Sequence, residues 1–585
     1  MAAGDVAAAG AALAVASAVM VGPWGGGGEG ALQPARPTVN TPTTIHRIPH
    51  LVRLMNKVCQ PCFEAVAFRL QNRVHFVLSS NKVTRPARLE RGVEGPTRQF
   101  RNPDLRGPLG IYLTGKEAVS TAIHFPSGFL WGAATSSYQI EGAVDVDGRS
   151  PSIWDRFCER PGAIEDGTDG ARACDHYRRY ADDVALIEEL GLDSYRFSVA
   201  WPRVIPGGTG AVNDRGLDFY RRLVDRLLEK GIRPLVTLYH WDLPQVLEDR
   251  GGWPARDTAK AFVDYAAVVV GALGDRVEDW VTHNEPWCAS VLGYQDGKHA
   301  PGRTNARDAL AAAHHLMLSH GLAVPVVREL SAGARVGLSN IICPGQPASP
   351  SHADAEACRV FDGVFNRWYF DPLYGRGYPE DIVAFHRAQG HLPEGPMPFL
   401  RDGDLETMAA PTDFIGLNYY SRAVCRDETI PEAENEPVTV RRAPKSEDTD
   451  MGWEVYPEGL YDALMRVHRD YAPPKILLTE IGCAYDTGPD ETGRVADHRR
   501  IRFLHDHLVA ARRAMADGVP LEGVYMWSLL DNFEWAFGYA MRFGIVYVDF
   551  ETQERFPKDS ARWLRDSIAA GELQPPGAAG EVRQM

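Results

Sequence analysis

Eight short apolar runs alternate with helical patterns along most of this chain, and this alternation limits the possible fold more than any other feature. Each run is bounded by Gly, Pro or Asp, which is typical of a buried strand. The stretches between the runs carry apolar residues at spacings of three and four, which is typical of amphipathic helices. The sequence therefore predicts eight strand–helix units.

Eight such units predict an α/β fold, and the closed (β/α)8 TIM barrel is the arrangement that they fit. A doubly wound open sheet would show the same alternation, so the positions of the functional residues must decide between the two folds. We predict strands at 129–135, 194–201, 234–241, 279–283, 335–342, 413–420, 475–480 and 523–528. We predict helices at 177–190, 217–230, 258–273, 307–329, 356–370, 460–471, 499–517 and 560–568.

The predicted barrel domain covers residues 120–572, and its βα loops must be long. A barrel of this class takes roughly 250 residues and exceeds 400 only with insertions. The polar segment 422–453 is interpreted as one such loop. Candidate functional side chains follow the C-terminal ends of the predicted strands, which is where barrel active sites are built. Their placement favours the closed barrel over the open sheet.

The two ends of the chain differ from this region. Residues 1–119 contain a glycine run and only brief apolar stretches, so we interpret them as a disordered N-terminal extension. A small accessory module and translated upstream sequence are the alternatives. Residues 573–585 are interpreted as a loose C-terminal tail.

Charge and cysteine content bear on partners and location. A net charge of -15 and a pI near 5.7 argue against nucleic acid, which needs a cationic surface. The apolar segment 6–22 follows Asp5 and is short, so we expect no membrane anchor or signal peptide. Nine scattered cysteines favour a reduced, cytoplasmic protein, with secretion as the alternative. Cys59 and Cys62 form a lone Cys-x-x-Cys, for which a zinc or redox role is disfavoured. The oligomeric state stays open.

Two glutamates close apolar, strand-like runs and suggest chemistry. Glu285 lies in Thr-His-Asn-Glu-Pro-Trp and Glu480 in Leu-Leu-Thr-Glu-Ile-Gly. A glutamate at a strand end is usually just solvated, but Asn284 and Trp287 crowd Glu285, and burial against an aromatic ring raises a carboxyl pKa. One neutral and one ionised carboxyl group in a shared site can cleave a glycosidic bond.

Further side chains are candidates to support these glutamates and to bind a sugar. Arg196 and Tyr420 are predicted to keep Glu480 ionised and aimed, and Asn284 could donate to a sugar 2-hydroxyl. Each alone is more often structural. A sugar pocket needs polar groups beside aromatic platforms. The predicted substrate-binding set, besides Asn284, is Gln139, His240, Trp241, Trp527, Glu534, Trp535 and Phe543.

From about residue 125 to residue 568 the chain resembles the β-glycosidases of glycoside hydrolase family 1. Five long segments carry the resemblance, in the family's order: Phe-Leu-Trp-Gly-Ala-Ala-Thr-Ser-Ser-Tyr-Gln-Ile-Glu-Gly, Tyr-Arg-Phe-Ser-Val-Ala-Trp-Pro-Arg, Thr-His-Asn-Glu-Pro-Trp, Leu-Thr-Glu-Ile-Gly and Trp-Ser-Leu-Leu-Asp-Asn-Phe-Glu-Trp. The resemblance implies that Glu285 is the acid/base and Glu480 the nucleophile. It also implies that Gln139, His240, Asn284, Glu534 and Trp535 bind the sugar, that Trp527 stacks on it, and that Arg196 and Tyr420 support the nucleophile.

The resemblance implies a retaining exo-β-glycosidase without metal or organic cofactor. A β-glucosidase acting on small β-glucosides or cello-oligosaccharides is expected, with β-galactosidase or β-fucosidase side activity. A noncatalytic sugar-binding member of the same fold is the alternative. Two positions depart from the family pattern: Ile481 replaces the usual Asn, and His283 the frequent Phe. Glu534 would repel a 6-phosphate, so phosphorylated sugars are disfavoured.

Overall fold

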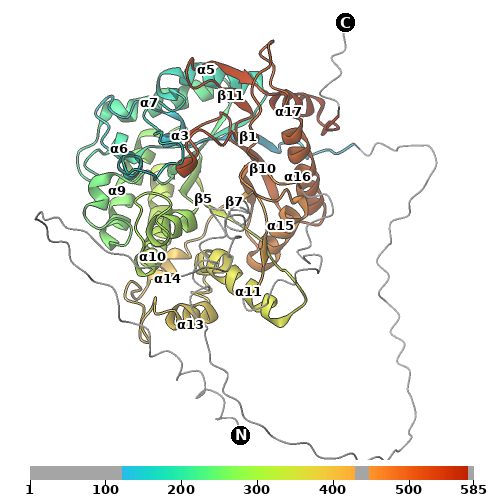
Figure 1. Ribbon diagram of the computed structural model, residues 1–585. Helices are drawn as coiled ribbons and strands as arrows, with labels where there is room; N and C mark the ends of the chain where they lie inside the picture. Colours follow the sequence, from blue (N-terminus) through green and yellow to red (C-terminus); the bar gives the residue numbers. More distant parts are fainter. Residues whose placement is uncertain (1–121, 428–446, 578–585) are drawn as a thin grey trace, which may run out of the picture. The chain divides into compact units, whose positions relative to one another are not determined.

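The computed structural model describes residues 122–427 and 447–577, and its centre is a closed barrel of eight parallel strands (Figure 1). The closed sheet confirms the predicted TIM barrel and excludes the doubly wound alternative. In the order of the chain, the barrel strands are β1 (Leu130–Ala134), β2 (Ser194–Ser198), β3 (Arg233–Tyr239), β4 (Asp279–Asn284), β5 (Arg335–Ile341), β7 (Ile415–Tyr419), β9 (Ile476–Ile481) and β10 (Leu521–Trp527).

Each of these strands overlaps one of the eight predicted runs. Every residue of β9 is buried, as expected of a parallel strand covered on both faces. The strand register places candidate site residues next to one another across neighbouring strands. Asn418 of β7 pairs with Glu480 of β9. Ala134 of β1 pairs with Arg196 of β2 on one side and with Trp527 of β10 on the other. Side chains from distant parts of the sequence therefore meet at the C-terminal ends of the strands.

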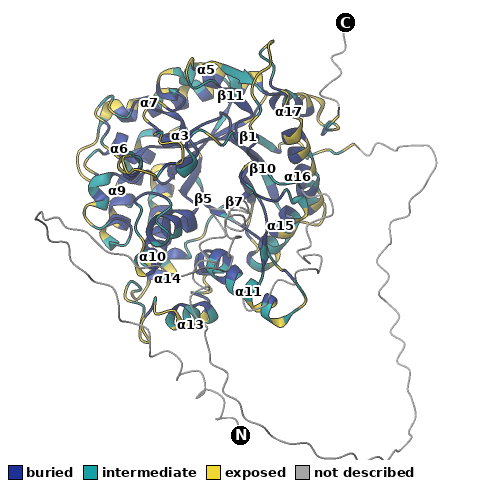
Figure 2. Ribbon diagram, in the orientation of Figure 1, coloured by how far each residue is buried: buried dark blue, intermediate teal, exposed yellow. Residues whose placement is uncertain are grey.

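Helices ring the barrel, with their buried faces turned to the strands and their exposed residues outward (Figure 2). Seven predicted helices are confirmed to within a few residues. They are α5 (His176–Glu189), α7 (Asp214–Glu229), α9 (Arg256–Leu273), α10 (Ala306–Leu330), α15 (Pro457–Tyr471), α16 (His498–Ala516) and α17 (Asp559–Ala570).

The predicted continuous helix 356–370 is wrong. Helix α11 (His352–Asp362) ends early, a π-helical turn η2 (Gly363–Arg367) follows, and α12 (Trp368–Phe370) completes the segment. A tertiary contact accompanies the break: the side-chain amide of Asn366 donates to the backbone carbonyl of Cys343 at 2.9 Å and accepts from its N–H at 3.2 Å. Local periodicity carries no signal for this bond.

The loop predicted at 422–453 also contains a strand. β8 (Ala423–Cys425) pairs in parallel with β6 (Gly345–Pro347), beside the barrel. Residues 428–446 of this loop lie outside the described part of the chain. The other two-stranded sheet joins β11 (Val546–Val548) to β12 (Arg555–Pro557).

Shorter elements, most of which no pattern predicted, fill the connections. They are α3 (Ser137–Ile140), α4 (Ile153–Cys158), α6 (Trp201–Val204), α8 (Gln245–Glu248), the π-helix η1 (Cys288–Gln295), η3 (Pro372–Tyr374), α13 (Glu380–Ala388), α14 (Asp404–Met408) and η4 (Trp535–Phe537). Three of them, α3, η1 and η4, directly carry residues of the candidate site described below.

Helix α10 is long and apolar enough to cross a membrane by length and composition alone. Of its most apolar window, 78% is buried inside the protein, so α10 is a core helix of the barrel. No other helix of the described segments meets the same criteria.

The described part begins and ends side by side. The backbone N–H of Leu573 donates to the carbonyl of Ile123 at 2.9 Å. The predicted extension 1–119, with Cys59, Cys62 and the apolar segment 6–22, lies outside the described residues. Residues 578–585 of the predicted tail also lie outside them.

Candidate active site

A cavity of about 60 Å³ lies at the C-terminal ends of the barrel strands and holds both candidate glutamates. Loops and strand ends between residues 240 and 543 contribute to it. It is lined by His240, Trp241, Glu285, Cys288, Leu292, His299, Ile341, Tyr420, Met451, Trp453, Glu480, Trp527, Glu534, Trp535, Phe537 and Phe543.

Each carboxylate oxygen of Glu480 accepts a hydrogen bond from a predicted supporting residue. Glu480 lies near the end of β9 and is buried. The Arg196 guanidinium donates to its Oε1 at 2.6 Å, and the Tyr420 hydroxyl donates to its Oε2 at 2.6 Å. Burial raises the pKa of Glu480, whereas both donors favour the charged form. The predicted supporting residues are thus in contact with the glutamate, and their hydrogen bonds favour the ionised carboxylate and fix its orientation.

Glu285 has a different environment. It follows β4 in a left-handed backbone conformation, with φ of 45°, and is buried. It accepts one amide hydrogen bond, from Asn418 Nδ2 to Oε1 at 2.7 Å. Burial, followed by the nearby charge of Glu480, raises the pKa of Glu285 to about 8. Glu285 therefore holds its proton at neutral pH, as a proton donor must.

Asn418 joins the two glutamates, and the sequence analysis did not single it out. Besides Glu285, its Nδ2 donates to Asn284 Oδ1 at 3.0 Å, and its Oδ1 accepts from the Thr479 hydroxyl at 2.7 Å. Its hydrogen bonding also lowers the pKa of Glu480. The only available signal was a polar amide within an otherwise apolar strand, directly before Tyr419.

The orientation of Asn284 follows from its partners. Its Oδ1 accepts from Arg196 Nη2 at 2.6 Å and from Asn418. Its Nδ2 lies 3.1 Å from His240 Nε2. Burial and the charge of Arg196 hold the pKa of His240 well below its usual range, so the imidazole is neutral and accepts from the amide. The Asn284 amide is fixed with its N–H group on the side of His240, which lines the cavity.

A third carboxyl group, that of Glu534, lines the same cavity. Glu534 is buried and accepts from Gln139 Nε2 at 3.4 Å. Gln139 is itself held by the Ser136 hydroxyl, which donates to its Oε1 at 2.6 Å. Burial, followed by the charge of Glu480, raises the pKa of Glu534 to about 8. Three carboxyl groups thus share one cavity, and two of them are held protonated at neutral pH.

Aromatic rings form the walls between these polar groups. His240 is stacked with Trp527 and with Trp535, at centroid distances of 5.7 and 6.0 Å. Trp241 Nε1 donates to the backbone carbonyl of Asn284 at 2.9 Å and so ties the ends of β3 and β4 together. The predicted substrate-binding residues thus gather around this cavity.

Phe543 packs at the same cavity, in an edge contact with Tyr420 at 6.0 Å. Trp453, which the sequence analysis missed, packs on Tyr420 at 5.2 Å and on Phe543 at 6.0 Å. No periodic pattern marks Trp453, because it sits in the long connection between β8 and α15.

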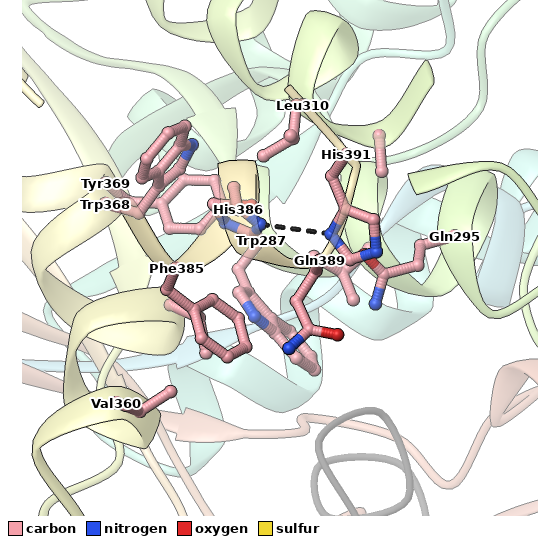
Figure 3. Close-up of a pocket in the computed structure, with 13 residues that line it drawn as sticks. Trp287, Gln295, Leu310, Val360, Trp368, Tyr369, Phe385, His386, Gln389 and His391 are labelled. Carbon is pink, nitrogen blue, oxygen red and sulfur yellow. Dashed lines mark hydrogen bonds between the residues drawn. The ribbon is translucent and has the colours of Figure 1, made fainter. Parts of the chain in front are cut away.

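Trp287 does not line this cavity. Together with the aromatic rings of Trp368 and Tyr369 it lines a second cavity of about 80 Å³ (Figure 3). η1 separates the two: Cys288 and Leu292 face the glutamates, whereas Trp287 and Val291 face the second cavity. Trp241 and Tyr420, not Trp287, are among the aromatic residues that line the cavity with Glu285. The second cavity is larger, but it is lined by no carboxylate.

The two departures from the family pattern are accommodated in the scaffold. His283 Nε2 is hydrogen-bonded to the Ser319 hydroxyl at 2.8 Å, and its ring packs on Phe262 with centroids 4.3 Å apart. Ile481 is fully buried in the hydrophobic core. Neither residue lines the catalytic cavity.

Within the described segments, no group of three or more His, Cys, Asp and Glu side chains is arranged to hold a metal ion. The site described above consists of carboxyl, amide, guanidinium and phenol groups, which suit acid–base and covalent chemistry.

Comparison with known proteins agrees with this geometry. The family model described as "Glycosyl hydrolase family 1" matches residues 121–572. Beta-glucosidase A of Acetivibrio thermocellus is 47% identical over 446 residues, which are 76% of this chain and 98% of that protein. A bifunctional beta-D-glucosidase/beta-D-fucosidase of Bifidobacterium breve is 44% identical over 467 residues, covering 76% and 98% of the two chains.

Solved structures are similar over the same region. A family 1 β-glucosidase from Thermotoga maritima in complex with isofagomine lactam superimposes with a TM-score of 0.72 at 44% identity, covering 77% of this chain and 100% of that one. The same enzyme with galacto-hydroximolactam gives a TM-score of 0.71 at 43% identity and the same coverage. The barrel, the paired glutamates and these matches establish that the chain belongs to glycosyl hydrolase family 1.

Proposed function

We propose that this protein is a retaining β-glucosidase that removes terminal β-D-glucosyl residues from small β-glucosides. The observation that carries the proposal is the unequal pair in one cavity. Glu480 is held by a guanidinium and a phenol, whereas Glu285 is held neutral by burial and by the charge of Glu480. The relatives named as β-glucosidases support the choice of glucose.

In the first step, a Glu480 oxygen attacks the anomeric carbon and the glycosidic C–O bond breaks. The Glu285 proton passes to the leaving oxygen, so the aglycone departs as a neutral alcohol. Tyr420 and Arg196 fix the attacking carboxylate so that one of its oxygens faces the substrate. The product of this step is a glucosyl ester of Glu480.

In the second step the roles reverse. Once Glu480 is esterified, its charge no longer raises the pKa of Glu285, so Glu285 is ionised and can accept a proton from water. The oxygen of that water attacks the anomeric carbon, and the bond between this carbon and the Glu480 oxygen breaks. Two inversions give net retention, and the carboxyl groups of retaining enzymes stand about 5 to 5.5 Å apart.

Sugar recognition is assigned to the polar and aromatic residues around the cavity. Gln139 and Glu534 would bind hydroxyls at the far end of the ring, and Asn284 would donate to the 2-hydroxyl. Trp527 and Trp535 offer apolar faces to the C–H groups of the sugar. Burial holds Glu534 protonated at neutral pH, so the proposal of a sugar without 6-phosphate rests on the nearby charge of Glu480.

Further substrates and a location are also proposed. β-Fucosidase side activity is supported by the bifunctional relative from Bifidobacterium breve, and cello-oligosaccharides are proposed as further substrates. The noncatalytic alternative finds no support, because the chain has both glutamates in place. A cytoplasmic location is proposed from the nine scattered cysteines of the sequence, which form no repeating framework.

The experiment compares hydrolysis of a chromogenic β-glucoside by the wild-type protein and by Glu480→Gln. We expect the variant to lose activity by a factor on the order of 10⁵, as with other enzymes that lose a covalent nucleophile. Equal activity of the two proteins would overturn the proposed mechanism. Proton NMR of the first-formed sugar tests retention separately: the β-anomer is expected, and the α-anomer would exclude a retaining enzyme.

A further inference from the structure

Two thiols outside the catalytic cavity are in contact. Cys358 lies on α11 and Cys425 is the last residue of β8, and their side chains are hydrogen-bonded to each other. Both sulfur atoms lie beside Gly345 of β6: a Cβ atom on Gly345 would be 2.9 Å from Sγ of Cys358 and 3.5 Å from Sγ of Cys425. Any side chain at position 345 would therefore crowd both sulfur atoms, and glycine leaves that space open.

The backbone around the pair is well anchored. β6 and β8 form a parallel ladder in which Gly345 pairs with Ala423 and Pro347 with Cys425. The Ser351 hydroxyl caps the N-terminus of α11 by accepting from the N–H of Asp354 at 3.0 Å. The Asp354 carboxylate in turn accepts from the backbone N–H of Asp427, just after β8, at 2.8 Å. The two thiols therefore meet because three fixed elements bring them together.

The two thiols differ in access and in acidity. Cys358 is half-buried, whereas Cys425 is buried. The hydrogen bond from Cys425 lowers the pKa of Cys358, and the same bond together with burial raises the pKa of Cys425. Cys158 is also half-buried, yet burial raises its pKa to about 12. Cys358 is thus both the more accessible and the more acidic thiol of the two, and access and acidity favour reaction with peroxide.

We propose that Cys358 and Cys425 are a redox-sensitive pair, which hydrogen peroxide converts to a disulfide that fastens α11 to β8. The Cys358 thiolate attacks one peroxide oxygen, so an S–O bond forms, the O–O bond breaks, and hydroxide leaves and is protonated to water. The Cys425 sulfur then attacks the resulting sulfenic acid, an S–S bond forms, and the S–O bond breaks. The hydroxyl group leaves as a second water with the Cys425 proton. Overall, two thiols and one peroxide give one disulfide and two waters.

The experiment treats the full-length reduced protein with hydrogen peroxide and then blocks the remaining thiols. Non-reducing peptide mapping and thiol counting follow. Other cysteines, Cys59 and Cys62 among them, can oxidise as well, so the result is read as a difference between variants. We compare the wild type with Cys358→Ser, and use Cys158→Ser as the matched control at another half-buried thiol.

We expect a peptide linked through Cys358 and Cys425 in the wild type and in Cys158→Ser, with two more thiols lost than in Cys358→Ser. The cross-link closes a long loop, so oxidation should raise Tm by about 3–5 °C in the wild type and leave Cys358→Ser unchanged. A Cys358 peptide that stays reduced, or that is linked to Cys343 instead, would overturn the proposal. None of these readouts depends on hydrolytic activity, so the outcome is independent of the proposed β-glucosidase function.

Discussion

At the scale of single residues, the protein uses one cavity to give two glutamates unequal proton affinities. Arg196 and Tyr420 hold Glu480 by direct hydrogen bonds, whereas Glu285 has one amide donor and a like charge nearby. The difference in neighbours decides which carboxyl group attacks and which one donates a proton.

The rate of β-glucoside hydrolysis should show a bell-shaped dependence on pH. Hydrolysis needs Glu285 protonated, and its pKa of about 8 places the alkaline limb there, with activity falling as pH rises through that value. The acid limb reflects protonation of Glu480 as pH falls, and burial moves that limb above the ordinary range of a glutamate. A pH profile of kcat/KM from pH 4 to 10 checks this. An alkaline limb that persists unchanged in Glu285→Gln would contradict the assignment.

The effect of removing the Glu285 carboxyl group should depend on the leaving group of the substrate. Glu285→Gln is expected to slow hydrolysis of an alkyl β-glucoside by about 10²- to 10⁴-fold, because the alcohol then leaves without a proton. The first step with a dinitrophenyl β-glucoside, whose leaving group needs no proton, should be much less affected, and burst kinetics measure it. Equal losses for both substrates would show that Glu285 does not protonate the leaving oxygen.

Holding Glu285 neutral has a cost in stability above pH 4.5. The ordinary pKa is 4.5 and the folded value is about 8, so the folded protein binds more protons between these values and stability falls as pH rises through this window. Glu285→Gln, which keeps the acceptor for Asn418, should therefore stabilise the protein by about 1–3 kcal/mol at pH 8 and by little at pH 4.5. Denaturant unfolding at both pH values measures this difference. The exposed Glu329→Gln is the control, and a gain of equal size at both pH values would contradict the account.

Asn418 is expected to be a positioning residue between the two glutamates. Asn418→Ala removes the hydrogen bond to Glu285 and leaves Asn284 with Arg196 as its remaining donor. We predict a fall in kcat of about 10- to 100-fold with a smaller change in KM. The hydrogen bond from Asn418 favours the charged form of Glu285, so its loss should raise the pKa of Glu285 and move the alkaline limb to higher pH. A change confined to KM would assign Asn418 to sugar binding instead.

At the scale of the elements, much of the architecture could be predicted from the sequence. The eight barrel strands were predictable because each lies in a short run rich in apolar residues and bounded by Gly, Pro or Asp. Helix α11 was not, because its end coincides with the hydrogen bonds between Asn366 and Cys343, which periodicity cannot reveal. The same limit applied to Asn418 and Trp453: their roles arise from contacts across strands and loops. The position of Trp287 beyond η1 was missed for a similar reason, because a π-helical turn changes which side chains share a face.

The C-terminal ends of β9 and β10 can lie close together at the site because residue 482 is a glycine. A Cβ atom there would lie 1.8 Å from the backbone carbonyl oxygen of Trp527. Gly482→Ala should therefore push the two strand ends apart, lower the stability by about 1–3 kcal/mol and reduce kcat, because Glu480 and Trp527 lie on those ends. Thermal unfolding and steady-state kinetics check both effects. Gly488→Ala, where a Cβ atom would meet nothing within 4 Å, is the control and should match the wild type.

At the scale of the whole molecule, the catalytic unit coincides with the family match at residues 121–572. A protein that begins at residue 120 should therefore keep kcat/KM for a β-glucoside within about two-fold and unfold at the same temperature. This comparison with the full-length protein also tests the proposed domain boundary. A large loss of activity or stability on removal of residues 1–119 would show that the extension contributes to the folded enzyme.

The central claim is that Glu480 becomes covalently glucosylated. A 2-deoxy-2-fluoro-β-glucoside with a good leaving group slows the second step, because fluorine destabilises the oxocarbenium-like transition state, so the ester accumulates. Mass spectrometry of the digested protein should then find one fluoroglucosyl group on the peptide that contains Glu480. A label on any other residue, or an unlabelled protein that still hydrolyses β-glucosides, would contradict the account.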